Sequence, residues 1–255
     1  MSPTFIAARV WNVFFTWKYE MTLLKLHKVF SSGFVAASLC LCSISAFAEG
    51  GISIQGTRIV YPQGAKQVNV LLSNNSRTDT FLVQSWVDAA SGGKTKDFVV
   101  TPPLYVSKPE DGNNLRVMYT GGELPKDRET LYYFIVKAIP SVDKKDTEGK
   151  NSLILAAANR IKLFVRPAGL KPELREAPAQ LTFRRSGKTL EINNPGPYYL
   201  TLTEIKAGSH KLENVMVSPK GKASIPLPAG SGSSVTFRTI NDHGALTPAL
   251  TKSIQ

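Results

Sequence analysis

Cysteine is almost absent from this chain of 255 residues, which contains only Cys40 and Cys42. Both lie in an apolar N-terminal segment, so no disulfide is available to the rest of the chain and its stability must come from a packed core. Histidine is nearly as scarce. After that segment only His210 and His243 occur, and their wide separation does not indicate a metal-binding pair. We therefore expect no metal and no cofactor.

Motifs for nucleotide or nucleophilic chemistry are also missing. Gly-Lys-Thr occurs at residues 93–95 and 187–189, but Asp88 and Thr182 stand where a phosphate-binding loop needs its first glycine. Both sites are better interpreted as hairpin turns. There is no G-x-S-x-G elbow for a serine nucleophile. The sequence thus favours a binding protein over an enzyme, with an exported β-sandwich hydrolase left open as an alternative.

Residues 1–48 are interpreted as a leader and secretory signal peptide that is removed. After Met21 a basic stretch, TLLKLHK, leads into the apolar run VFSSGFVAASLCLCSISA, which ends in the cleavage pattern Ala46-Phe47-Ala48. A transmembrane anchor is the competing reading, but the A-x-A ending favours cleavage after Ala48. Residues 1–20 precede the second methionine, which leaves open whether they are translated. No later segment is long and apolar enough to span a bilayer, so we expect no stable membrane insertion.

The chain is basic, with 31 Lys and Arg against 19 Asp and Glu. Without the first 48 residues these numbers become 27 and 18, a net charge of +9. An exported protein rarely meets nucleic acid, so we expect none as a partner. Acidic protein partners or an anionic membrane surface fit this charge better.

The rest of the sequence consists of short β-type runs separated by turn residues about every ten positions, a spacing typical of immunoglobulin-like sandwiches. A second series of such runs begins at QLTFRRSGKTLEI. We predict an all-β chain of two immunoglobulin-like β-sandwich domains, residues 49–167 and 173–255, with AGLKP at 168–172 as a linker.

The first β-run changes its pattern near Gly56. Apolar residues follow one alternation up to Ile54 and the opposite one from Ile59. Such a change predicts a bulge or the passage of a strand from one sheet to the other. Arg58 lies just beyond this point, and on this segment alone an exposed surface arginine is the ordinary interpretation.

The segment NSLILAAANRIKLFVRP, residues 151–167, is unusually apolar. A long strand would place on one face Leu153, Leu155, Ala157, Asn159, Ile161 and Leu163. A helix competes, because several apolar residues also follow helical spacing, but the all-β surroundings favour a strand. If its edge were exposed, pairing with another chain would be its function; the alternative is an internal strand that is covered on both faces.

Several motifs in this order resemble the PapD-like periplasmic chaperones of chaperone–usher pili. They are GTRIVYP (56–62), LVQSWVD (82–88), VTPPL (100–104), LPKDRETL (124–131), VKAIP (136–140), NRIKLFVRP (159–167), PYYLTL (197–202) and INDHG (240–244). The resemblance covers essentially the whole chain after the signal peptide. It implies an ATP-independent periplasmic chaperone with its two domains in a boomerang arrangement.

In this family the chaperone binds, folds and caps pilus subunits by donor-strand complementation and delivers them to an outer-membrane usher. The resemblance implies that Leu153, Leu155 and Ala157 of the donor G strand enter the groove of the subunit. It also implies that Arg58 and Lys162 hold the C-terminal carboxylate of the subunit, a role that suits charge-assisted hydrogen bonds. Self-association of the free protein through this edge is a further expectation.

The resemblance assigns Glu129, Arg166 and Asp242 to a charged network that orients the domains. The sequence departs from the family pattern at Ile135, where asparagine is common, and at Gly196, where a hydroxyl residue is usual. The short segment at 141–150 matches the subgroup with a short F–G loop. A secreted structural protein, such as a pilus subunit or an adhesin, is the alternative, although such a subunit normally carries an N-terminal donor extension and a disulfide.

Overall fold

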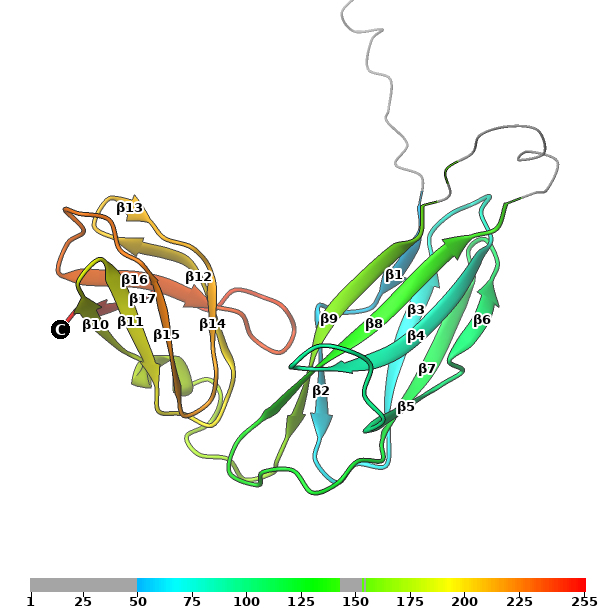
Figure 1. Ribbon diagram of the computed structural model, residues 1–255, viewed down its shortest axis with the longest axis horizontal. Coiled ribbons are helices and arrows are strands. Elements are labelled where there is room, and N and C mark those ends of the chain that lie inside the picture. Colours follow the sequence, from blue (N-terminus) through cyan, green and yellow to red (C-terminus); the bar gives the residue numbers. More distant parts are fainter. Residues whose placement is uncertain (1–49, 143–152, 154) are drawn as a thin grey trace, which may run out of the picture. The chain divides into compact units, whose positions relative to one another are not determined.

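The computed structural model describes residues 50–142, 153 and 155–255, and the predicted signal peptide lies outside them. Within these ranges the regular structure is β-strand, except for one short 3₁₀ helix, η1 (Ala177–Gln180). The strands form two successive β-sandwiches (Figure 1). The prediction of two immunoglobulin-like β-sandwich domains is confirmed.

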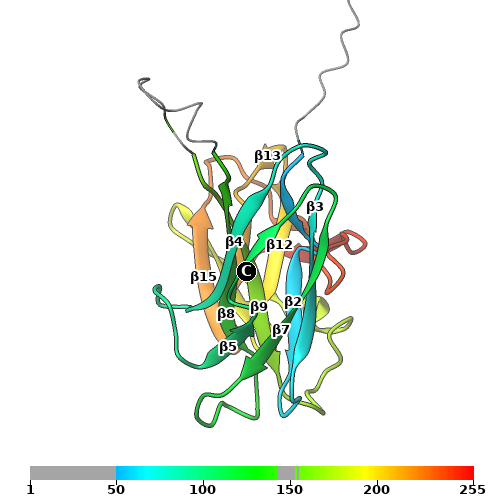
Figure 2. The same ribbon diagram turned by 90° about the vertical axis from the view of Figure 1, so that its right-hand side faces the viewer.

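The first sandwich packs a four-stranded sheet, β1-β3-β7-β5, against a five-stranded sheet, β2-β9-β8-β4-β6 (Figure 1, Figure 2). Its strands are β1 (Ile52–Ile54), β2 (Arg58–Pro62), β3 (Val68–Asn74), β4 (Phe81–Ala89), β5 (Phe98–Thr101), β6 (Leu104–Ser107), β7 (Gly112–Tyr119), β8 (Thr130–Pro140) and β9 (Ala157–Arg166). Both sheets contribute alternate apolar residues to one core, among them Leu72, Val83, Leu115, Phe134 and Leu163. This alternation is the reason that the sequence folds as strands with one buried face.

The second sandwich has a separate core. One sheet has the order β10-β11-β15, and the other has the order β13-β12-β16-β17, with β14 also paired to β12. The strands are β10 (Thr182–Ser186), β11 (Thr189–Asn194), β12 (Leu200–Ala207), β13 (His210–Lys211), β14 (Val215–Val217), β15 (Gly221–Pro226), β16 (Ser234–Thr239) and β17 (Leu250–Ser253). Gly187 has a φ of +59° in the turn between β10 and β11, so this Gly-Lys-Thr site is a hairpin turn, as predicted.

The change of alternation near Gly56 marks a passage between sheets. β1 pairs with β3 in the four-stranded sheet, whereas β2 pairs in parallel with β9 in the five-stranded sheet. Gly56 has a φ of +97° between them, a backbone conformation that glycine adopts readily. The switch brings Arg58 to the start of a strand that runs beside β9.

Within the apolar segment, Ala157–Arg166 form a strand rather than a helix, and the described residues before Ala157 do not extend it. β9 begins at Ala157, and the described residues Leu153, Leu155 and Ala156 precede it without strand pairing. β8 pairs with β9 from Ala157 onward, whereas β2 pairs with it only from Lys162 onward. The expected strand is therefore formed only where a neighbour supplies hydrogen bonds. From residue 157 to 161 one edge of β9 has no strand beside it among the described residues.

Candidate functional site

Arg58 and Lys162 are direct partners in the parallel pairing of β2 with β9. Paired residues project to the same face of a sheet, so the two cationic side chains lie side by side. Each reaches an oxygen of the second sandwich: Arg58 Nη1 donates to the Ile240 carbonyl at 3.1 Å, and Lys162 Nζ donates to Thr201 Oγ1 at 2.9 Å. The two residues that supply these acceptors are also joined through their backbones, because the Ile240 N–H donates to the Thr201 carbonyl at 3.2 Å.

Both acceptors are neutral, so neither cation is neutralised by its hydrogen-bond partner. Among the described residues neither Arg58 nor Lys162 forms an ion pair, and the buried Arg58 Nε has no hydrogen-bond partner there. Burial is the main cause that lowers the pKa of Arg58, and the charges of Asp242 and Glu129 partly oppose it. Burial likewise lowers the pKa of Lys162, and repulsion by Arg58 adds to this effect. A bound anion would relieve both penalties.

Glu129, Arg166 and Asp242 meet in one network. Arg166 Nε donates to Glu129 Oε1 at 2.6 Å, and its Nη1 and Nη2 donate to the two carboxylate oxygens of Asp242 at 2.7 and 2.8 Å. The second oxygen of Glu129 accepts the Tyr199 N–H at 2.8 Å. The network therefore links the first sandwich to residues of the second, and it uses the planar fork of arginine in two directions.

The pKa shifts in this network reflect competition between burial and pairing. Burial raises the pKa of Glu129, and the charge and hydrogen bond of Arg166 oppose this shift. Burial alone would lower the pKa of Arg166, but its hydrogen bonds and charge interactions with Asp242 and Glu129 outweigh burial and raise it. Both acids form their direct ion pairs with Arg166, and they act on Arg58 only through longer-range charge interactions.

The row of residues predicted to enter a subunit groove changes from buried to exposed along β9. Leu163 is 0% exposed in the core of the first sandwich, Ile161 is half-buried and Ala157 is exposed. Leu155 is 73% exposed and Leu153 is 83% exposed. Exposure thus rises from Leu163 in the core of the first sandwich to the two leucines that precede β9. Exposed leucines at an open strand edge are unusual in a monomeric protein.

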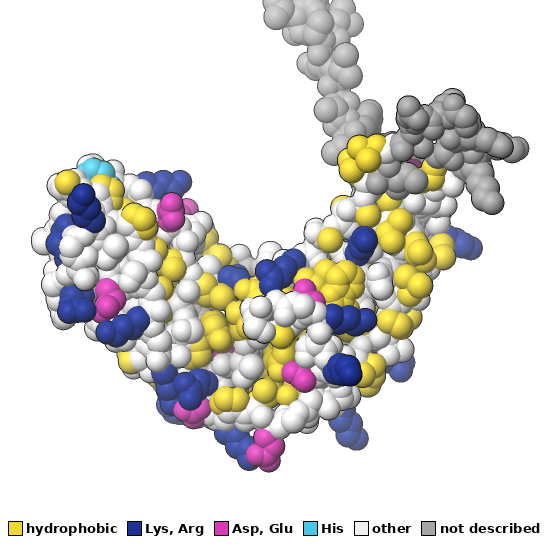
Figure 3. Space-filling model, viewed as in Figure 1, with side chains coloured by type: hydrophobic (Ala, Val, Ile, Leu, Met, Phe, Trp, Pro, Cys, Tyr) yellow, Lys and Arg dark blue, Asp and Glu magenta, His cyan; other side chains and the backbone are white. Residues whose placement is uncertain are grey.

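The outer face of the five-stranded sheet carries further apolar side chains. Figure 3 shows hydrophobic side chains gathered over this sheet with Lys and Arg among them. The exposed apolar residues there include Leu82 on β4 and Leu104 and Val106 on β6. Arg160 stacks over the ring of Tyr133 with its Cζ atom 3.4 Å from the ring centroid, a cation–π contact that the sequence analysis did not foresee.

The two departures from the family pattern have separate surroundings. Ile135 is buried and lies opposite Arg160 in the pairing of β8 with β9. Gly196 donates its N–H to Asn194 Oδ1 at 3.0 Å, so the turn there is closed by an asparagine side chain.

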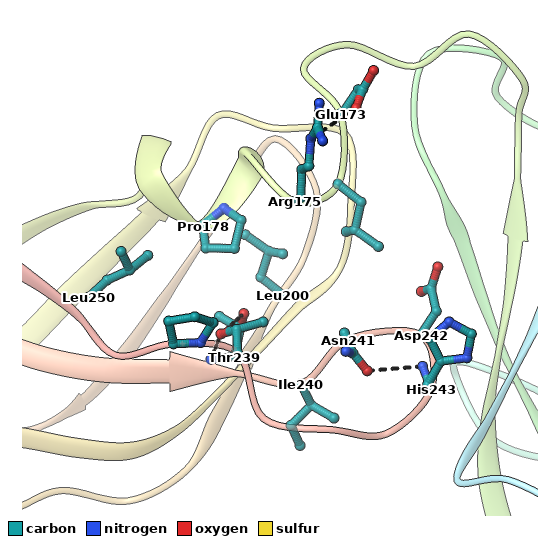
Figure 4. Close-up of a pocket in the computed structure, with 13 residues that line it drawn as sticks. Glu173, Arg175, Pro178, Leu200, Thr239, Ile240, Asn241, Asp242, His243 and Leu250 are labelled. Atoms are coloured by element: carbon teal, nitrogen blue, oxygen red, sulfur yellow. Dashed lines mark hydrogen bonds and ion pairs between the residues drawn. The ribbon is translucent and has the colours of Figure 1, made fainter.

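A hollow of about 570 Å³ lies within the second sandwich. Figure 4 shows Pro178, Leu200 and Leu250 on one side and residues 240–243, which follow β16, on the other. Asn241 Oδ1 accepts the His243 N–H at 3.0 Å there. Across the described part of the chain, no three His, Cys, Asp or Glu side chains gather in a way that could hold a metal.

Sequence reasoning found the two cations and the three network residues but missed the acceptors at Thr201 and Ile240. A carbonyl acceptor carries no side-chain identity, so residue type could not mark Ile240. Both residues lie within motifs that carried the resemblance, Thr201 in PYYLTL and Ile240 in INDHG, and those motifs were the available hint.

A two-sandwich fold with an open strand edge and an adjacent cation pair defines a class of β-sandwich binding proteins. The family comparisons agree with this class. Residues 51–171 match the model described as "Pili and flagellar-assembly chaperone, PapD N-terminal domain", and residues 176–250 match "Pili assembly chaperone PapD, C-terminal domain". The chain belongs to the PapD family of pilus-assembly chaperones.

Relatives and solved structures support the assignment. The chain is 47% identical to "Probable fimbrial chaperone SfmC" of Escherichia coli over 82% of this chain and 90% of that protein. It is 49% identical to "Chaperone protein FimC" of Escherichia coli over 82% of this chain and 86% of that protein. The structure of "the Periplasmic Chaperone SfaE" matches with a TM-score of 0.70 at 40% identity, covering 80% of this chain and 100% of that one.

A chaperone–pilin complex is also among the structural matches. "Salmonella enterica SafA pilin in complex with the SafB chaperone" matches with a TM-score of 0.74 at 28% identity, covering 82% of this chain and 99% of that one. The family, the relatives and this match establish a pilus-chaperone role for the chain. Within the described residues, no helix has the length and apolar character needed to cross a membrane.

Proposed function

We propose that this chaperone binds pilus subunits by donor-strand complementation, without ATP or catalysis, and delivers them to an outer-membrane usher from the periplasm. In this proposal residues 1–48 are removed on export. The working protein then consists of domains 49–167 and 173–255, joined by residues 168–172.

The observation that carries the proposal is the pair Arg58 and Lys162 beside an open strand edge. Two half-buried cations with neutral acceptors favour an anion that brings its own charge. A peptide C-terminus ends in a planar carboxylate, which arginine can hold as a fork while lysine acts as a point charge. We therefore assign the subunit's C-terminal carboxylate to this pair.

The unpaired edge of β9 supplies the rest of the binding surface. A subunit strand added there would gain main-chain hydrogen bonds, the basis of β-augmentation. At ~3.3 Å per residue, a strand that continued beyond Ala157 would place Leu155 about 23 Å from Lys162 and Leu153 about 30 Å from it. In such a strand both leucines would share a face with the buried Leu163, and because they are exposed in the free protein, the apolar groove of another domain would cover them.

Fixing the carboxylate also fixes the register of this pairing. A slip of one residue would turn Leu153, Leu155 and Ala157 to the opposite face of the strand. The anchor thus supports specificity as well as affinity. We assign Glu129, Arg166 and Asp242 to the orientation of the two domains, because their hydrogen bonds are satisfied among themselves and Tyr199.

The proposal is tested by purifying tagged protein from periplasm and identifying the bound subunit by mass spectrometry. Arg58→Ala and Lys162→Ala are compared with Arg116→Ala, a change of an exposed β7 arginine on the other sheet. We expect wild type and Arg116→Ala to retain a subunit that both anchor variants lose, with all four proteins folded by circular dichroism. Equal retention by folded anchor variants would remove the carboxylate assignment.

A further inference from the structure

The loop between β16 and β17, residues 240–249, has a rigid local structure. Asn241 Oδ1 accepts the N–H groups of His243 at 3.0 Å and Ala245 at 2.9 Å. The Thr247 N–H donates at 2.8 Å to the last carbonyl of β16. These bonds close the loop on itself, so that its tip has a defined position.

Gly244 forms the tip of this loop and lies against Thr57, the residue before Arg58. Its φ of +83° is a conformation that favours glycine. A Cβ atom at this position would lie 2.4 Å from Thr57 Oγ1 and 3.2 Å from Thr57 Cγ2. The missing side chain of Gly244 therefore permits the contact.

A larger residue at position 244 would require Thr57 or the backbone to move. Of the two other staggered χ1 positions of Thr57, one brings the methyl group to the present place of Oγ1. The other turns Hβ toward position 244 and leaves Oγ1 near the present place of Cγ2, about 3.2 Å from the added Cβ, with Thr57 Cβ still at 3.4 Å. Because the contact stays tight in either case, we expect the loop to shift, and this shift changes the position of Arg58 relative to Ile240, whose carbonyl accepts from Nη1 at 3.1 Å.

We propose that the loop of residues 240–249 is the positioning element for Arg58, with Gly244 seated on Thr57 and the Ile240 carbonyl holding the guanidinium. In this arrangement the second sandwich sets the geometry of an anchor that the first sandwich supplies. Gly244 is a positioning residue, since its own atoms need not touch the subunit. The inference rests on the proposed carboxylate site and adds to it the residues that set its geometry.

The test uses acetate, the simplest carboxylate, titrated at low ionic strength into isotope-labelled protein. The NMR signals of the Arg58 and Lys162 side chains report binding at the site itself. Gly244→Ala is compared with Thr57→Ala, with the double variant, and with Gly230→Ala. Gly230 has a φ of +77° but nothing within 4 Å of its added Cβ. Gly230→Ala therefore introduces the same kind of backbone strain as Gly244→Ala but no steric clash.

We expect Gly244→Ala to weaken acetate binding about tenfold, because one charge-assisted hydrogen bond of Arg58 is misplaced. Gly230→Ala should stay within about twofold of wild type, and Thr57→Ala should bind acetate more tightly than Gly244→Ala does. The double variant should recover most of the loss, because Thr57 Cβ would lie 3.4 Å from the new methyl group, an ordinary contact. A general loss of stability would not be repaired by removing Thr57 atoms.

The outcomes separate this inference from the proposed function. If Arg58→Ala abolishes acetate binding while Gly244→Ala binds like wild type, the positioning role is wrong and the anchor stands. If wild type shows no acetate response, or Arg58→Ala responds equally, the anchor fails and the positioning role fails with it. If Gly244→Ala does not fold, the double variant decides: a folded protein that binds acetate supports the clash, and any other result overturns it.

Discussion

Replacing Lys162 with methionine removes one charge from the site and leaves nearly the same unbranched stem. Lys162 Nζ has one acceptor within the described residues, Thr201 Oγ1 at 2.9 Å, and stands in register with Arg58. Methionine keeps the packing of the stem and cannot donate to a carboxylate. Any loss of subunit affinity then reports the contribution of the ammonium group rather than the effect of a cavity.

The size of the effect follows from the half-buried position of Lys162. Two unit charges at ~4 Å attract by about 4 kcal/mol at an effective dielectric constant near 20. Binding also costs the ammonium part of its hydration, so a net value of about 1.5–3 kcal/mol is expected for one charged hydrogen bond. At 1.4 kcal/mol per factor of ten, this is a loss of about 10- to 100-fold in affinity for the subunit.

Exchange of the subunit between chaperones provides the assay. A purified complex of Lys162→Met is mixed with an excess of differently tagged wild-type chaperone, and transfer of the subunit is followed over time. Lys108→Met, a change at an exposed position of the same domain, serves as the control. Transfer should be faster from Lys162→Met and unchanged from the control. Equal transfer rates from both complexes, with equal unfolding midpoints, would refute the charge argument.

Three further results are expected. Leu155→Asp should abolish subunit retention and leave the unfolding midpoint unchanged, because this side chain is 73% exposed in the free protein. Leu163→Ala, at a buried position of β9, should lower the free energy of unfolding in chemical denaturation by about 2–5 kcal/mol. A lower unfolding midpoint for Leu155→Asp would contradict this prediction. Burial raises the pKa of Glu129, so its protonated form contributes stability that is fully present below pH 4.5 and is lost as the pH rises through the folded-state pKa. The free energy of unfolding of wild type should therefore fall relative to that of Glu129→Gln across this pH range. Plots of unfolding free energy against pH that run parallel for the two proteins would count against this prediction. Lys162 must be protonated to hold a carboxylate and its pKa lies below 10.5, so subunit affinity should decrease as the pH rises through that lowered pKa in wild type but not in Lys162→Met.

The sequence predicted those features that depend on local pattern. Alternating apolar residues and regular turns indicated two β-sandwich domains, and the change of alternation at Gly56 indicated a bulge or a sheet switch. Pattern could not choose between those two, because only pairing with β3 or β9 distinguishes them. The apolar pattern also overestimated the length of β9. Such a pattern marks residues that can form a strand, but it does not show where a neighbouring strand supplies the hydrogen bonds.

The candidate site shows the same division. Motifs that resemble a known family pointed to Arg58, Lys162, Glu129, Arg166 and Asp242 from separate parts of the sequence. Their meeting depends on the parallel pairing of β2 with β9 and on hydrogen bonds between the sandwiches, neither of which local pattern encodes.

By itself, the sequence determined the fold class, the family and the chemical character of the residues that matter. Only the tertiary structure decided that two cations share one register, that their hydrogen-bond acceptors on Thr201 and Ile240 are neutral oxygens, and that Gly244 lies against Thr57. The physical reason is that residue type sets what a side chain can bind, whereas charge compensation and contact depend on distances between segments remote in the chain.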